Sequence, residues 1–484
     1  MTITARIDEA VPALVLSGVG ARPQSVTLDG RRARVEARLT GRGKTWTARL
    51  PLLADRWGAA GLPLPSGDYD LRVVASDGTV LGSDVSALAV ATPTFRVELT
   101  GGILRIGAPI DPAYESGDGQ AALERRYATR PGELENAVFF ESFYGRNASC
   151  NPRAIDRELA RVAPGVVRYW SVVDFSVPVP EGAIAVVEGT PQWWRARGVA
   201  RLLVVNDWLR RRYARRAGQT VLQTWHGTPL KRLALHRPGF DPRRMVAVVR
   251  ESRRWDVLLA QNPYSELVLR KAYAFLRRPV WVEGYPRNDV LVTGDGAATR
   301  TLLGIEPGER VFLYAPTWRD DRDRMVDFLD LEKLAADTGA VVLVRGHSRT
   351  IIPGSDAVGA RVIDVTTYPD IADLLVVADA LVTDYSSVMF DYTATGRPIV
   401  FFTPDLAHYR EDLRGFYFDL EAHAPGPMVT TQEELTAALA DTTVPAAYTG
   451  RYARWRDRFN ARDDGRAAER VVARILDQGY VSRE

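Results

Sequence analysis

The sequence predicts an α/β protein in which two doubly wound halves face a cleft, preceded by a small all-β domain. The first hundred residues form short runs that alternate apolar and polar side chains between turn signals, which is typical of antiparallel strands. The rest of the chain forms apolar runs separated by helical patterns, which indicates βα units. With 484 residues, the chain is too long for one ordinary domain and can build several cores.

The first expected domain covers residues 1–98 and is sandwich-like. Apolar and polar residues alternate over 33–39 and 69–74. Turn signals of the Asp-Gly type stand at 28–30 and 76–78, where tight hairpin connections are favoured. This range is therefore predicted to be an antiparallel β domain.

Beyond the β domain, the pattern changes in two steps. Residues 99–134 are rich in glycine, proline and charge and show no sustained periodicity before Ala121, so we expect a linker that ends in a short helix. Residues 135–295 and 296–484 each alternate apolar runs with helical patterns, which predicts one parallel sheet in each half. The expected strands are 137–140, 166–170, 184–187, 202–205, 221–222, 257–259 and 280–282 in the first half, and 311–314, 341–344, 381–383 and 399–402 in the second.

The composition predicts a globular protein of a reducing compartment. The chain is 46% hydrophobic and 25% charged, and no apolar run approaches the roughly 18 to 20 residues that span a bilayer. Its first residues lack the apolar region and cleavage site of a signal peptide, so we expect a cytoplasmic protein. The single cysteine, Cys150, excludes an intrachain disulfide and a thiolate zinc cluster, and we interpret it as a small core residue.

A strongly basic segment covers residues 195–254. It contains sixteen lysines and arginines against three acidic residues. Trp193, Trp194, Trp208 and Tyr213 lie beside or among these cations. This mixture is expected of a helix that rests on an anionic membrane surface, although the composition also suits nucleic acid or another polyanion.

The first candidate site residue is His226, which follows an apolar run that ends at Leu222. Ligands of open α/β folds bind at the edge of the sheet where such strands end. Gly227 lets the backbone approach a ligand closely, and Pro229 fixes the turn. An unperturbed histidine pKa of about 6.5 suits proton abstraction near neutral pH, so His226 is the candidate base.

A second candidate site begins at Ser386 and Ser387, where the apolar run 380–382 gives way to a helical pattern. Serine hydroxyls and the first free backbone N–H groups of a helix favour an anion, most naturally a phosphate. Asp391 follows one turn later on the same face, where it would accept a hydrogen bond from a ribose or polyol hydroxyl. The alternative is that these serines only cap a core helix.

Three further loops after apolar runs would line the same crevice. Arg345 offers a planar fork for phosphate oxygens, and His347 would lie on the same side of an extended loop. Arg287 would neutralise a diphosphate, with a surface turn as the alternative. Pro316 and Thr317 stand after the run that ends at residue 314. A single histidine after a strand is also often a structural hydrogen-bond partner, and this is the alternative for His347.

We predict no metal site and no certain cofactor. Asp320, Asp321 and Asp323 lie in a highly charged loop rather than directly after a strand. We interpret them as solvated side chains.

Five motifs of the chain resemble, in matching order, those of the CDP-glycerol glycerophosphotransferases of teichoic acid synthesis. They are residues 225–231 (WHGTPLK), 284–289 (GYPRND), 314–318 (YAPTW), 345–347 (RGH) and 383–392 (TDYSSVMFDY). The resemblance covers about Asn136 to the C-terminus and leaves out the N-terminal β domain. It implies a GT-B-like pair of Rossmann-type domains.

The resemblance also implies a mechanism and a set of site residues. His226 is expected to deprotonate a polyol hydroxyl, which attacks the β-phosphorus of CDP-glycerol or another CDP-polyol and releases CMP. His347 is expected to help bind the donor phosphates. The implied donor contacts are Gly227, Thr228, Pro229, Arg287, Pro316, Thr317, Arg345, Ser386, Ser387 and Asp391.

The resemblance further implies a lipid-linked polyol-phosphate acceptor and peripheral association with the inner face of the cell membrane, with no nucleic acid as a partner. Two alternatives stay open. One is a GT-B glycosyltransferase that uses a nucleotide sugar, because the same cleft serves any nucleotide diphosphate donor. The other is a non-catalytic protein that binds an anionic polymer.

Overall fold

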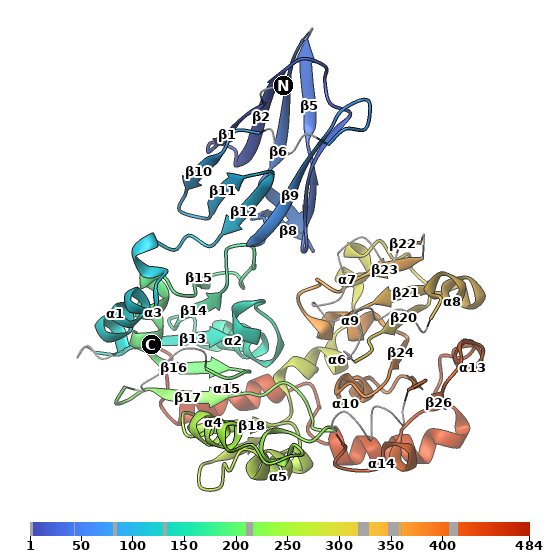
Figure 1. Ribbon diagram of the computed structural model, residues 1–484. Coiled ribbons are helices and arrows are strands. Elements are labelled where there is room, and N and C mark those ends of the chain that lie inside the picture. Colours follow the sequence, from blue (N-terminus) through green and yellow to red (C-terminus); the bar gives the residue numbers. More distant parts are fainter. Residues whose placement is uncertain are drawn as a thin grey trace. The chain divides into compact units, whose positions relative to one another are not determined.

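The computed structural model describes residues 3–42, 44–80, 85–128, 133–209, 216–317, 329–346, 358–359, 361–405 and 415–484 (Figure 1). The chain separates into two compact units. The first comprises Met1–Gly132, Tyr144–Ala148 and Tyr169–Gly198, and the second comprises Glu133–Phe143, Ser149–Arg168 and Val199–Glu484. None of the described helices is both long enough and apolar enough to span a bilayer.

The N-terminal part of the first unit consists of antiparallel sheets, as the alternating sequence predicts. One sheet has the order β1-β2-β6-β5, a second has the order β10-β11-β12-β9-β3-β4, and β7 pairs with β8. The strands are β1 (Ile3–Asp8), β2 (Ala13–Val19), β3 (Ser25–Gly30), β4 (Arg34–Glu36), β5 (Arg38–Arg42), β6 (Thr45–Pro51), β7 (Leu53–Arg56), β8 (Ala59–Pro63), β9 (Gly67–Val74), β10 (Leu88–Ala91), β11 (Arg96–Thr100) and β12 (Ile103–Gly107).

Alternate side chains of these strands form one apolar core. In β9, Tyr69, Leu71 and Val73 are buried, whereas Asp70 and Arg72 between them are exposed. The buried side chains join a cluster with residues of the other strands. Each large apolar side chain buried in this way stabilises the fold by about 1.5 to 3 kcal/mol.

The second sheet extends into the range 99–134 that we expected to be a linker. Strand β12 pairs antiparallel with both β11 and β9. Leu104 and Ile106 of β12 are buried, whereas Ile103 and Arg105 are exposed. This alternation covers only five residues, which is too short to produce sustained periodicity. The expected helix in this range is α1 (Gly117–Ala128), which the 3-10 helix η2 (Pro112–Tyr114) precedes.

Two predominantly parallel sheets follow, which confirms the α/β class. In the first, β13 (Glu135–Glu141), β16 (Ala200–Val205), β17 (Thr220–Gln223), β18 (Val257–Ala260) and β19 (Val280–Val282) are neighbours in this order. Strands β14 (Val167–Val172) and β15 (Ile184–Val187) pair in parallel. The helices in this part of the chain are α2 (Cys150–Val162), α3 (Pro191–Val199), α4 (Pro242–Ser252), α5 (Pro263–Ala272), α6 (Asp289–Thr293) and α7 (Ala297–Leu302).

The second parallel sheet has the order β22-β23-β21-β20-β24-β25-β26, with only the β22–β23 pair antiparallel. Its central strands are buried on both faces and therefore read as continuous apolar runs. The strands are β20 (Val311–Tyr314), β21 (Val341–Val344), β22 (Val358–Gly359), β23 (Val362–Asp364), β24 (Ala380–Thr383), β25 (Ile399–Phe402) and β26 (Met428–Val429). The helices are α8 (Leu331–Thr338), α9 (Ile371–Val377), α10 (Val388–Tyr392), α12 (Leu420–His423), α13 (Gln432–Ala438), α14 (Thr449–Phe459) and α15 (Ala467–Asp477).

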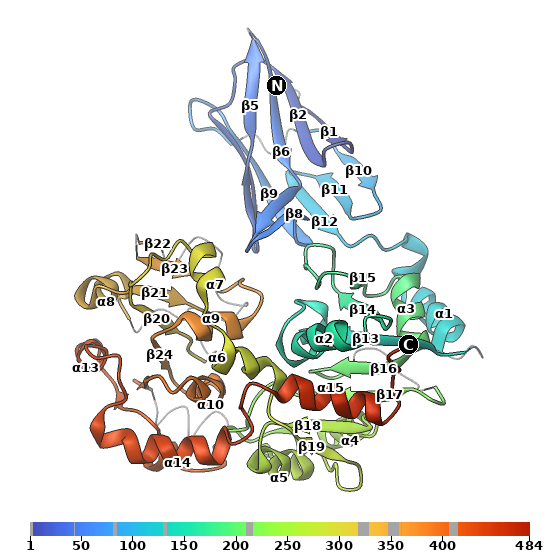
Figure 2. The same ribbon diagram turned by 180° about the vertical axis from the view of Figure 1, so that it is seen from behind.

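The last helix, α15, returns to the first parallel sheet, as Figures 1 and 2 show from opposite sides. It buries Ala467, Val471 and Ile475 and packs against α2. The backbone N–H of Ala467 donates to Asp289 at 2.8 Å. The side chain of Asn136 at the start of β13 donates to the carbonyl oxygen of Ser482 at 2.9 Å. Helix α15 is therefore part of the structure around the first sheet, although it comes last in the second expected half.

Candidate active site

The two principal sequence motifs meet in the structure. The loop after β17 carries His226 and Gly227, and the loop after β24 carries Ser386 and Ser387. A Cβ atom added to Gly227 would lie 2.7 Å from Oγ of Ser387, closer than a real side chain tolerates. Glycine therefore permits this approach without displacing Ser387, and the loops of the two parallel sheets are in contact here.

The imidazole of His226 is held in one tautomer. Its Nδ1 lies 2.6 Å from the main-chain oxygen of Asn206. A carbonyl oxygen can only accept, so Nδ1 must carry the proton, and in the neutral ring Nε2 has the free lone pair. Trp225 stacks on the ring at 4.8 Å, and Phe143 lies against it at 5.5 Å. The ring is thus oriented with Nε2 as its proton acceptor.

The surroundings of His226 also keep the ring neutral. Burial lowers the pKa of His226 below its ordinary value of 6.5. The carboxylate of Asp207 and the carbonyl of Asn206 oppose this effect, whereas the charge of Arg287 adds to it. At neutral pH the histidine is therefore predominantly unprotonated and able to take a proton.

The backbone around His226 is strained and held by buried amides. Trp225 has a φ of 53° and Phe143 a φ of 45°, both in the left-handed region that large side chains rarely adopt. Gln223 accepts from the Trp225 N–H at 2.9 Å, and Asn151 donates to the Trp225 carbonyl at 3.2 Å. Such strain costs of order 1 to 3 kcal/mol per residue, so the surrounding bonds must fix this turn.

Arg345 stands directly after β21, where burial disfavours its charged form and the charge of Asp370 favours it. Its Nη1 donates to the carbonyl oxygens of Tyr368 at 2.9 Å and Val365 at 3.3 Å, and among the described residues it forms no ion pair with a carboxylate. Burial lowers the pKa of Arg345 to about 10. A cation in this state is suited to an anionic ligand. His347, expected beside it, lies outside the described residues, as do Asp320, Asp321 and Asp323.

The serine hydroxyls make only a long hydrogen bond to the start of helix α10. Helix α10 begins at Val388, and Ser387 makes no side-chain cap hydrogen bond. The Oγ of Ser386 is 3.5 Å from the Val388 nitrogen, which is long for a hydrogen bond. The structure thus gives little support to the alternative that these serines are only caps. Both side chains are half-buried.

The neighbouring loop after β20 lies against the serine loop. The Thr317 N–H donates to the carboxylate of Asp384 at 2.8 Å, and the Thr383 hydroxyl donates to the Ala315 carbonyl at 2.7 Å. Pro316 and Thr317 are half-buried. These bonds place both loops at the same edge of the second parallel sheet.

Thr228 and Pro229 are tied to the protein. The Thr228 hydroxyl donates to Gln261 at 2.6 Å and accepts from Asn262 at 3.1 Å, and this side chain is buried. The Pro229 carbonyl accepts from the hydroxyl of Tyr264 at 2.8 Å. Both residues therefore fix the loop after His226.

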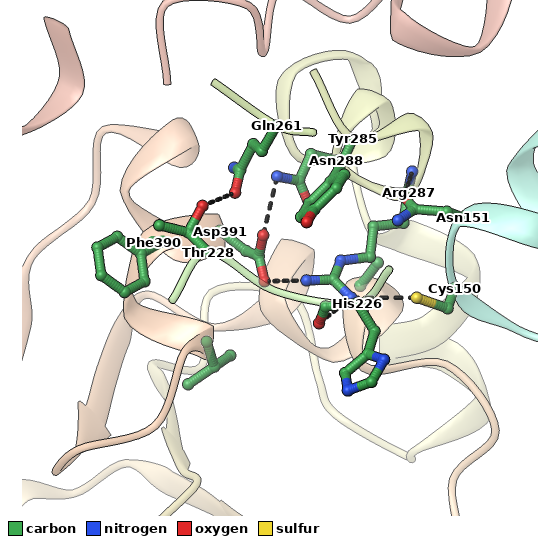
Figure 3. Close-up of polar contacts among 12 residues, drawn as sticks. Cys150, Asn151, His226, Thr228, Gln261, Tyr285, Arg287, Asn288, Phe390 and Asp391 are labelled. Carbon is green, nitrogen blue, oxygen red and sulfur yellow. Dashed lines mark hydrogen bonds and ion pairs between the residues drawn. The ribbon is translucent and has the colours of Figure 1, made fainter. Parts of the chain in front are cut away.

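Arg287 and Asp391, both expected to contact the donor, form a buried ion pair with each other (Figure 3). Nη2 of Arg287 is 2.6 Å from Oδ2 of Asp391, and the side chains are 5% and 4% exposed. Nη1 of Arg287 donates to the main-chain oxygen of His226 at 2.9 Å. Asn288 donates to the other oxygen of Asp391 at 3.0 Å. In each of these bonds, the side chain of Arg287 or Asp391 has another group of the protein as its partner.

Two residues that the sequence interpretation missed complete this region. Asn206, which holds His226, directly follows the buried strand β16, and that position is the same signal that identified the other loops. Asp463 accepts from Gln261 at 2.7 Å and from Asn460 at 2.9 Å. It lies between two helices, where no sequence signal distinguishes it.

The basic segment is only partly at the surface. Trp193 and Trp194, expected to contact a membrane, are instead buried, and the guanidinium of Arg197 lies 4.8 Å from the Trp193 ring. Among the described residues of the segment, the large apolar side chains that are exposed are Phe240 and, on α4, Met245 and Val246. Tyr213 lies outside the described residues.

Among the described residues, no three His, Cys, Asp or Glu side chains are grouped so that they could hold a metal ion.

Comparison with known proteins identifies the family. The family model for CDP-Glycerol:Poly(glycerophosphate) glycerophosphotransferase matches residues 125–477. The teichoic acid poly(glycerol phosphate) polymerase of Bacillus subtilis (strain 168) is 37% identical over 375 residues, which cover 72% of this chain and 50% of that protein. The chain thus spans half the length of that relative.

Two further relatives match over most of their own length. The teichoic acid glycerol-phosphate transferase of Staphylococcus aureus (strain NCTC 8325 / PS 47) is 35% identical over 379 residues, which cover 71% of this chain and 93% of that protein. A solved structure of the wall teichoic acid polymerase TagF is similar with a TM-score of 0.69 and 32% identity, covering 74% of this chain and 93% of that one. The chain belongs to the CDP-glycerol:poly(glycerophosphate) glycerophosphotransferase family.

Proposed function

We propose that the protein transfers glycerol phosphate, or a related polyol phosphate, from a CDP-polyol to a hydroxyl of a lipid-linked acceptor in the synthesis of a teichoic-acid-like polymer. The observation that carries the proposal is the fixed tautomer of His226, which leaves Nε2 free to accept a proton. The loop that carries His226 also contacts Ser387 through Gly227. The family membership and the names of the relatives support the same reaction. TagF was also determined after a 15 minute soak with CDPG.

In the proposed reaction, Nε2 of His226 takes the proton of the acceptor hydroxyl as its oxygen attacks the β-phosphorus of the donor. The new P–O bond forms a phosphodiester, the phosphoanhydride bond breaks, and its electron pair leaves on CMP. The imidazolium then returns its proton to solvent. Because the attacking and leaving oxygens both carry charge, positioning and electrostatic stabilisation supply most of the catalysis.

The groups proposed to bind the donor surround these two loops. Arg345 provides a positive charge, and its guanidinium donates to main-chain oxygens rather than to a described carboxylate. The hydroxyls of Ser386 and Ser387 and the N–H groups at the start of α10 are suited to phosphate oxygens. Gly227, Pro316, Thr317 and His347 complete the proposed donor site, and Thr228 and Pro229 shape its loop.

We also propose that the two parallel sheets form a GT-B-like pair of Rossmann-type domains, the first covering 135–295 with the returning helix α15 and the second the rest of 296–484, and that the antiparallel sheets form a sandwich-like accessory domain. The similarity to TagF supports the GT-B-like arrangement. Because β12 pairs within the antiparallel sheet, we extend the accessory domain from residue 98 to Gly107.

The proposed acceptor requires the protein to work at the inner face of the cell membrane. Helix α4 and the residue before its cap support such a contact, because Phe240 is 85% and Val246 57% exposed. Arg243 and Arg250 of the same helix are exposed as well. Apolar side chains that enter the interface and arginines that bind anionic head groups are the usual elements of a monotopic contact.

The test is CMP release from CDP-glycerol and CDP-ribitol, measured with and without a lipid-linked glycerol phosphate acceptor. We expect acceptor-dependent release that His226→Ala abolishes and that His423→Ala, at an exposed histidine, leaves intact. If the protein still binds nucleotide but releases CMP from neither donor, the proposal is overturned. Turnover of a nucleotide sugar in its place would support a glycosyltransferase.

A further inference from the structure

The guanidinium of Arg287 connects the two loops that carry the site. The residue lies in the 3-10 helix η5 (Pro286–Asn288), which follows β19. One nitrogen binds Asp391 of α10, five residues after Ser386, and the other donates to the carbonyl of His226. Two short contacts therefore run from Asp391 of α10 through Arg287 to the peptide of the candidate base, as Figure 3 shows for Asp391 and Arg287.

The peptide of His226 is held on its other side as well. The main-chain N–H of Arg287 donates to Oδ1 of Asn151 at 3.2 Å. The amide nitrogen of Asn151 donates to the carbonyls of Thr224 and Trp225 at 3.3 and 3.2 Å. The same short helix η5 thus supports both peptides before His226 and the carbonyl of His226 itself.

The charges indicate that this pair does not bind the donor. Burial would lower the pKa of Arg287, but the neighbouring groups of Asp391, Cys150 and Tyr285 together outweigh burial and raise it, so the guanidinium stays charged. Its charge is cancelled within the pair, and neither side chain is open to solvent. Arg345 differs in both respects, because it is half-buried and has no carboxylate partner among the described residues.

We propose that Arg287 and Asp391 are positioning residues, which fix the His226 loop against α10 and so set the distance between Nε2 and the donor phosphates. This inference rests on the proposed polyol-phosphate transfer. A lysine at position 287 would keep the charge but could not bind the Asp391 carboxylate and the His226 carbonyl in the same planar fork. The substitution would therefore change the geometry of the His226 loop and keep the positive charge at position 287.

The first test compares Arg287→Lys with two controls. We expect kcat for CMP release to fall by up to about 100-fold, because small misplacements of reacting groups have such effects. The Kd for CDP-glycerol, measured by calorimetry, should stay close to that of the native chain. Arg345→Lys should weaken CDP-glycerol binding. Arg397→Lys, at an arginine that donates to main-chain oxygens of Val376 and Ala378, should leave both constants unchanged.

A second variant separates positioning from a merely structural role. Because the charge of Arg287 helps to lower the pKa of His226, Arg287→Met should move the acidic limb of the pH–rate profile to higher pH, whereas Arg287→Lys should not. Thermal unfolding of each variant shows whether it is folded. If the native chain is active but Arg287→Lys lowers the affinity for CDP-glycerol and leaves kcat unchanged, this inference alone is overturned. A native chain that releases no CMP overturns the proposed function instead.

Discussion

Nδ1 of His226 lies 2.6 Å from the main-chain oxygen of Asn206, so the proposed base is oriented by a peptide group rather than by a carboxylate. The side chain of Asn206 in turn accepts from the N–H of Phe143, whose ring lies against the imidazole. One buried residue thereby fixes both the tautomer of His226 and an aromatic wall beside it. The peptide oxygen carries no net charge, but because it accepts from the ring it raises the pKa of His226 and partly opposes the effect of burial.

This arrangement predicts the pH dependence of the enzyme. Burial lowers the pKa of His226 below 6.5, so the neutral base persists as the pH falls through that value. We expect the acidic limb of kcat/KM to lie below pH 6.5, measured as CMP release across the pH range. Asn206→Asp should move the limb upward, because it introduces a carboxylate beside the ring. A limb above pH 6.5 in the native chain would contradict the predicted shift.

Gly227→Ala should impair catalysis through a direct clash. The added Cβ would meet Oγ of Ser387 at 2.7 Å and its Cβ at 3.1 Å, so the two loops must move apart. We expect kcat/KM to fall by about 10- to 100-fold with the fold retained, as circular dichroism would show. The matched control is Gly117→Ala, where an added Cβ would meet nothing within 4 Å. Equal activity of the two variants would show that the loops tolerate separation.

The network around Asp463 should make stability depend on pH. Burial, with the nearby charge of Asp391, raises the pKa of Asp463 to about 7, above the value of 3.8 expected when the chain is unfolded. Between these two values the folded chain holds a proton that the unfolded chain releases, so the stabilisation is lost progressively as the pH rises from about 4 to about 7, and the loss is complete above that.

We expect the free energy of unfolding in urea to fall from pH 5 to pH 7 by no more than about 1.4 kcal/mol per pH unit for this group, and to level off above pH 7. Asp463→Asn should reduce that slope, because an amide does not titrate. Asp464→Asn, at the neighbouring carboxylate that pairs with Arg470, should leave the slope in this window unchanged. If Asp463→Asn does not change the slope of the unfolding free energy against pH, other groups cause that slope.

The surface of α4 should determine binding to anionic membranes. Val246→Asp places a charge on the exposed apolar face, and Arg243→Ser removes a cation worth about 1 kcal/mol near such a surface, or roughly fivefold in affinity. We expect both variants to sediment less with vesicles that contain phosphatidylglycerol. Leu302→Asp, at an exposed leucine of α7, is the control. Unchanged sedimentation of both α4 variants would place the membrane contact elsewhere.

The sequence predicted the parts of the site that depend on local pattern. Buried parallel strands are apolar runs, and the polar residues directly after them, such as His226 and Ser387, lie at the sheet edge for that reason. It did not predict the pairing of Arg287 with Asp391, because these residues are 104 positions apart and meet only when the two loops pack. Composition also failed for Trp193 and Trp194, since the number of aromatic residues in a segment does not say which of them are buried.

The return of α15 to the first sheet affects how the protein folds during synthesis. Ala467 binds Asp289 across 178 positions of the chain, so the surface that α15 covers is exposed until those residues have left the ribosome. At about 5 to 20 residues per second, the first half waits on the order of 10 to 40 seconds for its last helix. During that interval the segment that carries His226 is translated but lacks part of its packing, and we expect chaperones to bind it there.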